Sequence, residues 1–388
     1  MLKVIVGMSG GVDSSVAGYL LKEKGYEVEG ISFLMWEENK GPGSAACCSL
    51  QAMDDASKAA RSIGISHSTI DVRNDFMDKV VKPFVSAYIS GLTPNPCILC
   101  NRFIKFPYLI KEAQKKGAEC ISTGHYASVE KEDFRIRGFK GSRTTSTFSL
   151  QPPIFLKKGS DPKKDQSYVL YPLTQEVLGN LILPLGYCRK SDVRNLAKEL
   201  VLPAAGRPES QEICFVEQKN YLAFIEELSP VRAEPGPLVD LNGRVIGSHK
   251  GIYGYTIGQR KGLGISSPEP LYVTDIDILK NTVYVGPREE AKKKEFFVEE
   301  LNWIITPNVP EFRACVKVRS TMKEEPATIT LLKNSLSPPF AKEGVGGVLD
   351  GIVRVVFDEP QWAPAPGQSA VFYDGDTVIG GGVIRRSA

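Results

Sequence analysis

A glycine-rich octapeptide near the start of the chain constrains the fold more than any other stretch. Residues Gly7–Ser14 read Gly-Met-Ser-Gly-Gly-Val-Asp-Ser; an apolar run at residues 2–6 precedes them, and Val16, Tyr19 and Leu20 follow at helical spacing. This pattern predicts a buried strand, a tight turn and a helix. Glycines let the backbone approach a ligand, and a helix start offers unpaired N–H groups and the positive end of its dipole. We therefore expect the turn to bind an anion.

The simplest alternative is an ordinary strand-to-helix turn that is capped by Asp13 or Ser14. The stretch lacks the Gly-Lys-Ser/Thr ending of a Walker loop. It resembles instead the PP-loop of the ATP pyrophosphatases. That resemblance implies that Gly7–Ser14 holds the pyrophosphate of ATP and that a substrate oxygen is activated by adenylation. Asp13 could then anchor a magnesium ion or cap the helix.

Composition sets the class of protein. A chain of 388 residues exceeds one hydrophobic core, so two or three domains are expected. There is no signal-peptide pattern and no apolar run of bilayer-spanning length, so we expect a cytoplasmic protein with no membrane partner. A net charge of +3 excludes a uniformly basic coat for nucleic acid. Any RNA binding would depend on local lysine clusters, which are otherwise plain solvated surface: residues 157–158, 163–164 and 292–294.

The first half of the chain alternates between strand and helix patterns. Strands are expected at residues 28–33, 65–70 and 120–123, and helices at residues 51–63, 76–89, 103–115, 178–185 and 190–200. This alternation predicts an α/β fold with a doubly wound parallel sheet, whose ligands bind at the carboxyl ends of the strands. Gly7–Ser14 and the pair Gly124-His125 would both lie on that edge.

The second half is rich in short strands. Asn242-Gly243 between apolar segments predicts a hairpin, and the alternation at residues 314–319 and 370–373 predicts a small C-terminal β-barrel. Residues 137–153 and 335–347 read as inserted loops. We expect three domains: an α/β catalytic domain at residues 1–206, a small central domain at residues 207–292 and a β-barrel at residues 293–388.

The Cys97-Ile-Leu-Cys100 pair follows a loop that Pro94 and Pro96 stiffen. With a helix expected from Phe103, Cys100 would lie at its start, where the dipole lowers the pKa of a thiol. A redox pair, a zinc half-site, iron–sulfur ligands and coincidence all stay open. The lack of a second Cys-x-x-Cys disfavours a four-cysteine zinc ribbon.

The other cysteines give weaker signals. The chain has eight, and in a reducing compartment they are expected to be buried, catalytic or metal-binding rather than disulfide-bonded. Cys214 lies beside Ile213 and Phe215, a context typical of a buried apolar residue. The adjacent pair at 47 and 48 stays undecided, and the remaining three are expected to be structural: Cys120, Cys188 and Cys315. His67 and His249 are expected to be surface or satisfied residues.

Ordered motifs then give a family resemblance over nearly the whole chain, apart from the two loop insertions. The matching stretches are Gly7–Ser14, Thr93–Phe106, Ser122–Ala127, Lys164–Tyr168, Ser210–Phe215, His249–Gly251, Tyr255–Gly264 and Pro366–Gly375. With these motifs the chain resembles the bacterial tRNA-specific 2-thiouridylases. The resemblance implies insertion of sulfur at C2 of the wobble uridine in the anticodon stem-loop of tRNA.

The chemistry implied by this resemblance uses ATP, magnesium and two cysteines. ATP would adenylate the C2 oxygen, and magnesium would offset the phosphate charge. Sulfur would arrive from an upstream sulfur carrier or cysteine desulfurase as a persulfide on Cys214. Cys100 would be the partner thiol that releases it.

The resemblance also assigns residues to ligands. ATP would contact Gly7, Met8, Ser9, Gly10, Gly11, Val12, Asp13, Ser14, Phe33 and Gly124, with Phe33 standing where the family often has Met. The target base would lie against Asn95, Pro96 and Cys97. The rest of the tRNA would contact His125, Lys164, Asp165, Gln166, Arg319, Ser320 and Gln368.

Cys97 departs from the family pattern. Many members carry Asp at this position, where it could assist proton transfer, and a cysteine cannot simply inherit that role. Cys97, Cys100 and Cys214 could instead hold a 4Fe–4S cluster by three thiolates and leave one iron open for hydrosulfide. The persulfide route and the cluster route therefore both stay open.

Two other functions compete with this one. A PP-loop ligase that adenylates a small carboxylate would explain the glycine turn but give no role to the cysteines and the β-barrel. The presence of tRNA in a purified sample would distinguish the thiouridylase from such a ligase. A non-catalytic iron–sulfur or zinc module that binds RNA would be excluded by tRNA-coupled production of AMP and pyrophosphate.

Overall fold

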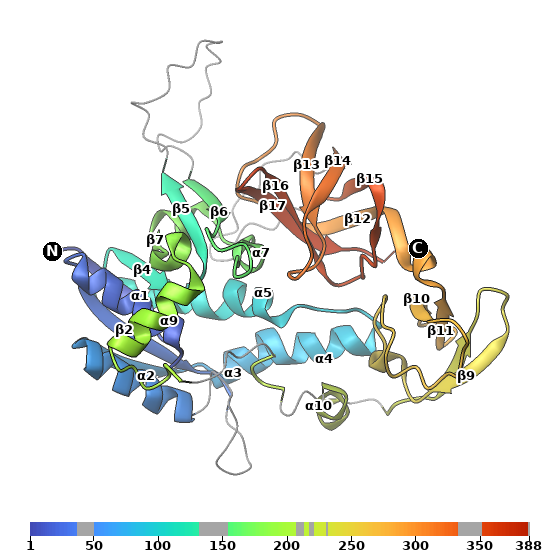
Figure 1. Cartoon of the computed structure of the whole chain (residues 1–388), viewed down its shortest axis with the longest axis horizontal. Helices are drawn as coiled ribbons and strands as arrows, with labels where there is room; N and C mark the ends of the chain where they lie inside the picture. The colour runs from blue at the N-terminus through green and yellow to red at the C-terminus, as the bar shows by residue number, and fades with distance from the viewer. Residues whose placement is uncertain are drawn as a thin grey trace.

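The computed structural model describes residues 1–36, 50–131, 154–206, 213–216, 221–229, 232–332 and 351–386. The pair Cys47-Cys48, both predicted insertions and the first half of the Ser210–Phe215 motif lie outside these residues. Figure 1 shows the α/β part at one end of the molecule, the red and orange barrel beside it, and the yellow strands of the central part at the other end. Among the described residues, no helix is long and apolar enough to cross a membrane.

The α/β part is built on a five-stranded sheet in the order β3-β2-β1-β4-β7, with every neighbouring pair parallel. Its strands are β1 (Lys3–Gly7), β2 (Glu27–Leu34), β3 (Ser66–Asp71), β4 (Cys120–Thr123) and β7 (Leu181–Ile182). The predicted doubly wound sheet is confirmed. The chain order reverses on either side of β1, so the carboxyl ends of β1 and β4 form the switch point where such sheets bind ligands.

Both faces of this sheet are covered at its centre, which explains why the inner residues of β1, Val4, Ile5 and Val6, are all apolar and buried. On β1, Val4 and Val6 pack towards α1 (Val12–Glu23) and α2 (Leu50–Ile63). Ile5 points the other way, into the cluster that includes Leu109 of α6 (Phe106–Lys115).

The cysteine pair lies within a longer helical segment than predicted. The helix expected at Phe103 begins at Pro96 as α5 (Pro96–Cys100) and continues through a π turn, Asn101–Lys105, into α6. Asn95 starts it early, because its side chain accepts a hydrogen bond from the Cys97 N–H at 3.1 Å. The π turn precedes Pro107, whose missing N–H and ring do not fit a regular helix.

Two other helix predictions need the same kind of correction. The helix expected at residues 76–89 is divided into α3 (Arg73–Phe76), a π turn at Met77–Val81 and α4 (Lys82–Ile89), with Pro83 after the turn. The helix expected at residues 178–185 is wrong. That stretch ends α8 (Gln175–Gly179), supplies β7 to the sheet and forms a 3₁₀ turn, because Pro184 stops a regular helix. Helix α9 (Lys190–Glu199) follows as expected.

The central part holds α10 (Tyr221–Leu228) and a four-stranded sheet, β10-β11-β8-β9. Its strands are β8 (Gly236–Val239), β9 (Val245–His249), β10 (Tyr272–Asp277) and β11 (Thr282–Gly286). The predicted Asn242-Gly243 hairpin joins β8 to β9, and Gly243 has the positive φ of +78° that such turns require.

The C-terminal part is the predicted β-barrel. Its strands are β12 (Lys292–Trp303), β13 (Glu311–Lys317), β14 (Glu325–Leu331), β15 (Val353–Trp362), β16 (Ser369–Asp374) and β17 (Thr377–Ile384). They follow one another in the order β12-β15-β14-β13-β16-β17, and an antiparallel β12–β17 pairing closes the barrel.

The barrel is joined to the α/β part by a shared hairpin. Strands β5 (Ala127–Lys131) and β6 (Ile154–Lys158) follow β4 in the chain, yet β6 pairs with β17 of the barrel. The short α7 (Ser167–Leu170) adds a buried hydrogen bond from the Tyr168 hydroxyl to the Ser369 carbonyl, at 2.8 Å. The exact domain boundaries stay a prediction.

Candidate active site at the carboxyl edge of the parallel sheet

The glycine turn connects β1 to α1 directly. Gly11 is the N-cap of α1 with an extended backbone, and no side chain caps the helix, so the capped-turn alternative is wrong. The Ser14 hydroxyl instead accepts from the Ser9 N–H at 3.1 Å and donates to the Gly11 carbonyl at 3.3 Å. The loop thus holds its own shape and leaves the start of the helix without a side-chain cap, as an anion site requires.

Two glycines of this edge have no room for a side chain. Gly10 has a φ of +73°, and a Cβ there would lie 2.4 Å from the Ala52 carbonyl oxygen. A Cβ on Gly124 would lie 2.6 Å from the backbone nitrogen of Ser14. The end of β4 therefore touches the first turn of α1, and the two motifs predicted for one edge are brought together.

Asp13 neither caps α1 nor stands free for a metal ion. The Lys190 ammonium lies 2.6 Å from each of its carboxylate oxygens, and the Tyr126 hydroxyl donates to Oδ1 at 2.8 Å. Sequence reasoning missed Lys190 and Tyr126, because neither lies in a spacing pattern with Asp13. The one available signal was weak: Lys190 begins a helix, where its own helix dipole disfavours a cation.

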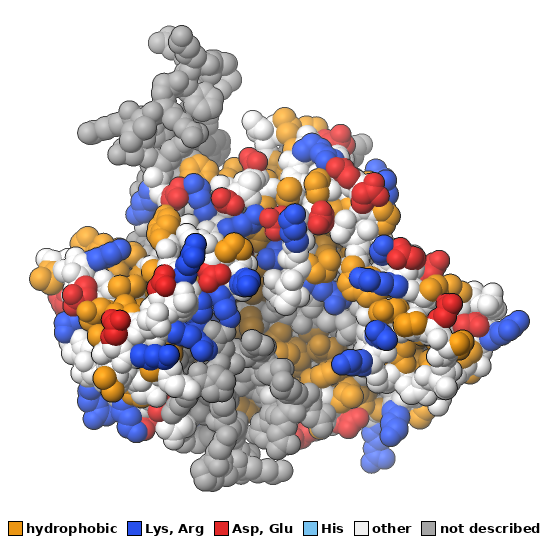
Figure 2. Space-filling view, in the orientation of Figure 1, with side chains coloured by type: hydrophobic (Ala, Val, Ile, Leu, Met, Phe, Trp, Pro, Cys, Tyr) orange, Lys and Arg blue, Asp and Glu red, His pale blue; other side chains and the backbone are white. Residues whose placement is uncertain are grey.

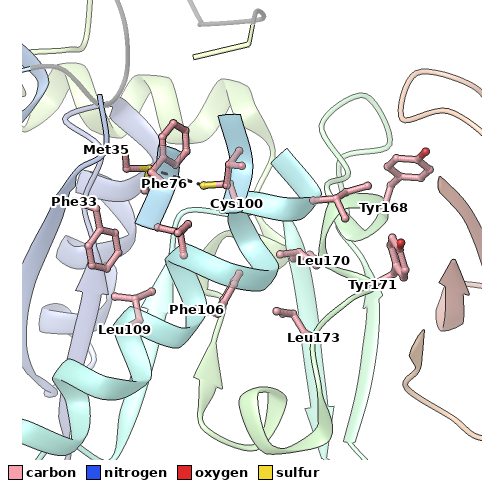
Figure 3. Close-up of a cluster of buried hydrophobic side chains, with 14 of the residues drawn as sticks. Phe33, Met35, Phe76, Cys100, Phe106, Leu109, Tyr168, Leu170, Tyr171 and Leu173 are labelled. Carbon is pink, nitrogen blue, oxygen red and sulfur yellow. Dashed lines mark hydrogen bonds between the residues drawn. The ribbon is translucent and has the colours of Figure 1, made fainter. Parts of the chain in front are cut away.

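Phe33, predicted to contact ATP, lies next to the last residue of β2, near the same edge. Its ring is buried and packs edge-to-face on Tyr108, with 6.1 Å between ring centroids. Figure 3 shows it directed towards Leu109, within the core. The side chain is thus part of the hydrophobic core, and the backbone is what this strand end presents to a ligand.

The two cysteines of the Cys-x-x-Cys differ in exposure. Cys97 is exposed in the first turn of α5, whereas Cys100 is buried and its thiol lies 3.8 Å from the Met35 sulfur. The predicted position of Cys100 at a helix start is wrong, since the helix begins at Pro96 and Cys97 is the thiol nearest its positive end. Figure 3 shows the Cys100 thiol directed towards Met35 and Phe76.

Cys214 packs against the same core as Cys100. It is half-buried, and Phe215 beside it inserts between aromatic rings, with centroid distances of 5.5 Å to Phe76, 5.3 Å to Phe84 and 5.3 Å to Phe224. Because Phe76 also lies beside Cys100, the two predicted catalytic cysteines share one aromatic cluster.

The three cysteines do not form a ligand set in this structure. Among the described residues, which include all three, no three His, Cys, Asp or Glu side chains lie close enough to hold a metal ion. As placed here, Cys97, Cys100 and Cys214 do not fit a 4Fe–4S cluster.

The loop that leads to Cys97 is held by the two other parts of the molecule. Thr93 donates its N–H to the Pro366 carbonyl at 2.8 Å and accepts at its carbonyl from Gln368 Nε2 at 2.9 Å. Its hydroxyl lies 3.4 Å from that of Thr256 in the central part. Gln368, predicted to contact tRNA, thus orients the segment that carries Asn95, Pro96 and Cys97.

His125 lies on the sheet edge as a neutral imidazole. Its Nδ1 is 2.7 Å from the Thr123 hydroxyl, and its ring stacks on Phe106 at 6.0 Å. Burial, helped by the nearby Lys105 charge, lowers the pKa of His125 to about 3. At neutral pH it can therefore donate or accept a hydrogen bond without carrying charge.

The segment Lys164–Gln166 forms a loop beside Tyr126. The Asp165 carboxylate accepts from the N–H groups of Gly159 and Ser167, each at 3.1 Å, and is buried. The Gln166 side chain accepts from the Tyr126 N–H at 2.9 Å. Two of the three predicted tRNA contacts thus build the loop, and half-buried Lys164 lies next to them.

Arg319 connects the barrel to the central part. Its Nη2 donates to the Ile257 carbonyl at 2.8 Å and to the Ala363 carbonyl at 3.0 Å, and burial lowers the pKa of its guanidinium. Its Nε is buried without a hydrogen-bond partner in the described part of the chain. Ser320 beside it is exposed. Figure 2 shows basic and acidic side chains interspersed over the face of the molecule that it draws, in agreement with the small net charge.

Of the two histidines outside the site, His67 is satisfied as expected, whereas His249 is satisfied at one ring nitrogen and its buried Nδ1 has no hydrogen-bond partner in the described part of the chain. His67 Nε2 lies 2.8 Å from the Ser32 hydroxyl, which itself donates to the Met8 carbonyl of the glycine loop at 2.6 Å. His249 is buried and its Nε2 lies 3.0 Å from the Asn281 carbonyl.

Comparisons with known proteins cover nearly the whole chain. Family models match a tRNA methyl transferase HUP domain at residues 2–218, a tRNA methyl transferase PRC-barrel domain at residues 223–287 and an aminomethyltransferase β-barrel domain at residues 343–384. A tRNA-specific 2-thiouridylase of Caldanaerobacter subterraneus subsp. tengcongensis is 45% identical over 99% of this chain and 98% of the relative. One of Clostridioides difficile is 42% identical over the same shares.

Solved structures are more distant. A 4-thiouridine synthetase–RNA complex with bound ATP matches at 17% identity and a TM-score of 0.35, over 58% of this chain and 50% of that one. An NMN synthetase from Francisella tularensis matches at 18% identity and a TM-score of 0.31, over 60% of this chain and 78% of that one.

Proposed function

Since the chain belongs to the tRNA-specific 2-thiouridylase family and is therefore a tRNA sulfurtransferase, we propose that it exchanges O2 of the wobble uridine for sulfur at the carboxyl edge of the parallel sheet. The observation that carries the proposal is that Gly124 touches the first turn of α1 at this edge, while Cys100 lies beside Met35, which follows the end of β2 at the same edge. The family assignment argues against the two competing functions, a small-carboxylate ligase and a non-catalytic module that binds RNA.

The first step is adenylation. The uncapped start of α1 and the backbone of Gly7–Ser14 hold the pyrophosphate of ATP. Gly124 allows the nucleotide to lie close to the first turn of α1, and neutral His125 provides a hydrogen bond to the RNA. The uridine O2 attacks the α-phosphorus, pyrophosphate leaves, and C2 carries AMP as a leaving group.

The second step transfers sulfur. A cysteine desulfurase or sulfur carrier loads Cys214 as a persulfide, whose terminal sulfur attacks C2 and displaces AMP. The Cys100 thiolate then attacks the Cys214 sulfur, and the electrons of the broken S–S bond go to the sulfur on C2, which becomes the thiocarbonyl. A Cys100–Cys214 disulfide results, and an external thiol reduces it before the next turnover.

Of the two inorganic groups named by the resemblance, only the iron–sulfur cluster does not fit the residues as arranged. Both Asp13 oxygens lie 2.6 Å from the Lys190 ammonium, so Asp13 is not available to a magnesium ion, which would enter on the ATP phosphates. The cysteines form no cluster ligand set. When bound, magnesium would offset phosphate charge; no step here depends on either group.

The anticodon stem-loop is the proposed substrate. Asn95, Pro96 and Cys97 lie against the splayed-out base, while Lys164, Ser320 and the loops that Asp165, Gln166, Arg319 and Gln368 hold contact the surrounding RNA. We retain the domain boundaries 1–206, 207–292 and 293–388 and a cytoplasmic location as part of this proposal.

The test is mass spectrometry of the wobble nucleoside after incubation of tRNA with the anaerobically purified protein, ATP and a persulfide donor. We expect 2-thiouridine and equal amounts of AMP and pyrophosphate from an iron-free sample. Thiolation that requires bound iron would contradict the persulfide route and support the cluster. Release of AMP and pyrophosphate that does not depend on tRNA would contradict the adenylation of uridine.

A further inference from the structure

We propose that Lys190 is a positioning residue of the ATP site, which keeps the start of α1 receptive to phosphate by neutralising Asp13. This inference rests on the proposed use of ATP at Gly7–Ser14. Lys190 lies far from that loop along the chain and belongs to none of the motifs that carry the family resemblance.

A charge conflict at the glycine loop creates the need for such a residue. Asp13 is the second residue of α1, whose N-cap is Gly11. A helix start attracts anions through its N–H groups and dipole, and a carboxylate in the first turn occupies the same field. An unpaired Asp13 would therefore repel the polyphosphate that the loop is shaped to receive.

Lys190 resolves the conflict by geometry. Its ammonium lies 2.6 Å from both oxygens of Asp13, and it also faces the ring of Tyr126 at 5.5 Å from the centroid. Only 9% of Lys190 is exposed, which is rare for a lysine and stabilised only by such pairing. The carboxylate at the start of α1 is thus neutralised from within the protein.

The position of Lys190 does not serve its own helix. It is the first residue of α9, where the positive end of the helix dipole disfavours a cation. Helix α9 is held against α1 by a shared apolar cluster, in which Val193 and Ala197 pack with Val16 and Ala17. This packing places the start of one helix beside the start of the other, so that the lysine acts on α1.

The experiment measures binding of inorganic pyrophosphate to the full-length protein by calorimetry, in EDTA so that no metal ion bridges the charges. Lys190→Met leaves Asp13 unpaired and should weaken binding about tenfold or more. Lys190→Arg keeps the charge and should stay within about threefold of wild type. The double variant Asp13→Asn/Lys190→Met removes both charges and should regain most of the affinity.

Steady-state thiolation adds a second readout. Lys190→Met should raise the KM for ATP about tenfold and leave kcat within about threefold, since Lys190 touches neither uridine nor sulfur. Thermal unfolding shows whether each variant folds. If Lys190→Met does not, the arginine and double variants still decide the matter, because both keep the charges balanced.

Pyrophosphate binding by Lys190→Met that equals wild type would overturn the inference. So would a double variant that binds as weakly as Lys190→Met, because Lys190 would then not act through Asp13. Wild type that binds pyrophosphate but does not thiolate tRNA contradicts the proposed function alone, and the charge series then still supports the inference. Wild type that binds no pyrophosphate overturns both.

Discussion

The glycine edge and the cysteine cluster lie on the same α/β part but are specified in different ways. At the glycine edge, defined here as Gly7–Ser14 with Gly124, backbone geometry alone leaves no room for side chains at Gly10 and Gly124. The cysteine cluster, defined as Cys100 and Cys214 with the aromatic rings between them, depends on side chains from segments far apart in sequence. A short motif can encode the first, whereas only the fold can assemble the second.

The largest expected effect separates the two regions by chemistry. Cys214→Ser should lower tRNA thiolation by about a thousandfold or more, because the oxygen cannot carry a persulfide. Binding of ATP at the glycine edge should be unchanged within about twofold. Thiolation is measured by mass spectrometry and ATP binding by calorimetry. A variant that loses ATP binding as well would show that the two regions are not separable.

A second substitution tests the glycine edge by geometry. Gly10→Ala should weaken ATP binding by about tenfold to a hundredfold and destabilise the fold by about 1–3 kcal/mol, because of its positive φ and the clash with the Ala52 carbonyl. Gly25→Ala is the matched control, since Gly25 has a φ of +82° and nothing within 4 Å of its missing Cβ. Equal ATP affinity in Gly10→Ala and wild type would contradict the assignment of the glycine loop as the ATP site.

The pH dependence of stability tests the neutral imidazole at this edge. The pKa of His125 is about 3 in the folded protein, well below the ordinary value of 6.5. The unfolded chain therefore binds the extra proton first, and the contribution of His125 is complete above pH 6.5 and lost as the pH falls towards 3. By pH 4.5, two pH units below the ordinary value, the loss should reach about 3 kcal/mol.

Chemical denaturation of wild type and His125→Asn between pH 4.5 and 7.5 measures this contribution. It is the difference between the two proteins in how steeply the free energy of unfolding changes with pH. Parallel stability curves for the two proteins would contradict burial of a neutral His125.

The smallest effect is expected at Cys97, which is exposed beside the cysteine cluster. Cys97→Asp should retain thiolation within about threefold when a persulfide donor is supplied, because the proposed step uses only Cys100 and Cys214. Iron content after anaerobic purification is measured in parallel. Loss of activity together with loss of iron would contradict the persulfide route and support an iron–sulfur cluster.

The sequence predicted the glycine edge well because local rules suffice there. An apolar β-branched strand, two glycines and a helix start determine the turn, and strand alternation places Gly124 on the same edge. The barrel and the Asn242-Gly243 hairpin were predictable for similar reasons, since each depends on alternation and turn residues.

The failures have tertiary causes. Periodicity does not reveal that Asn95 caps a helix seven residues before the predicted start, or that a π turn accommodates Pro107. The pairing of Lys190 with Asp13 depends on how α9 packs on α1. Gln368 and Arg319 stay predicted RNA contacts, and their hydrogen bonds also hold the parts of the protein together, a role that no spacing indicates.

Because of the hairpin β5–β6, we expect that the α/β part and the barrel cannot be exchanged independently during evolution. Because β6 lies against β17 and Tyr168 donates to Ser369, a gene fragment ending before β12 would encode a sheet edge and a buried tyrosine that lack their partners. Recombination that exchanged the barrel for an unrelated one would meet the same obstacle. The modules of this enzyme are thus expected to evolve together, with compensating changes on both sides of the hairpin.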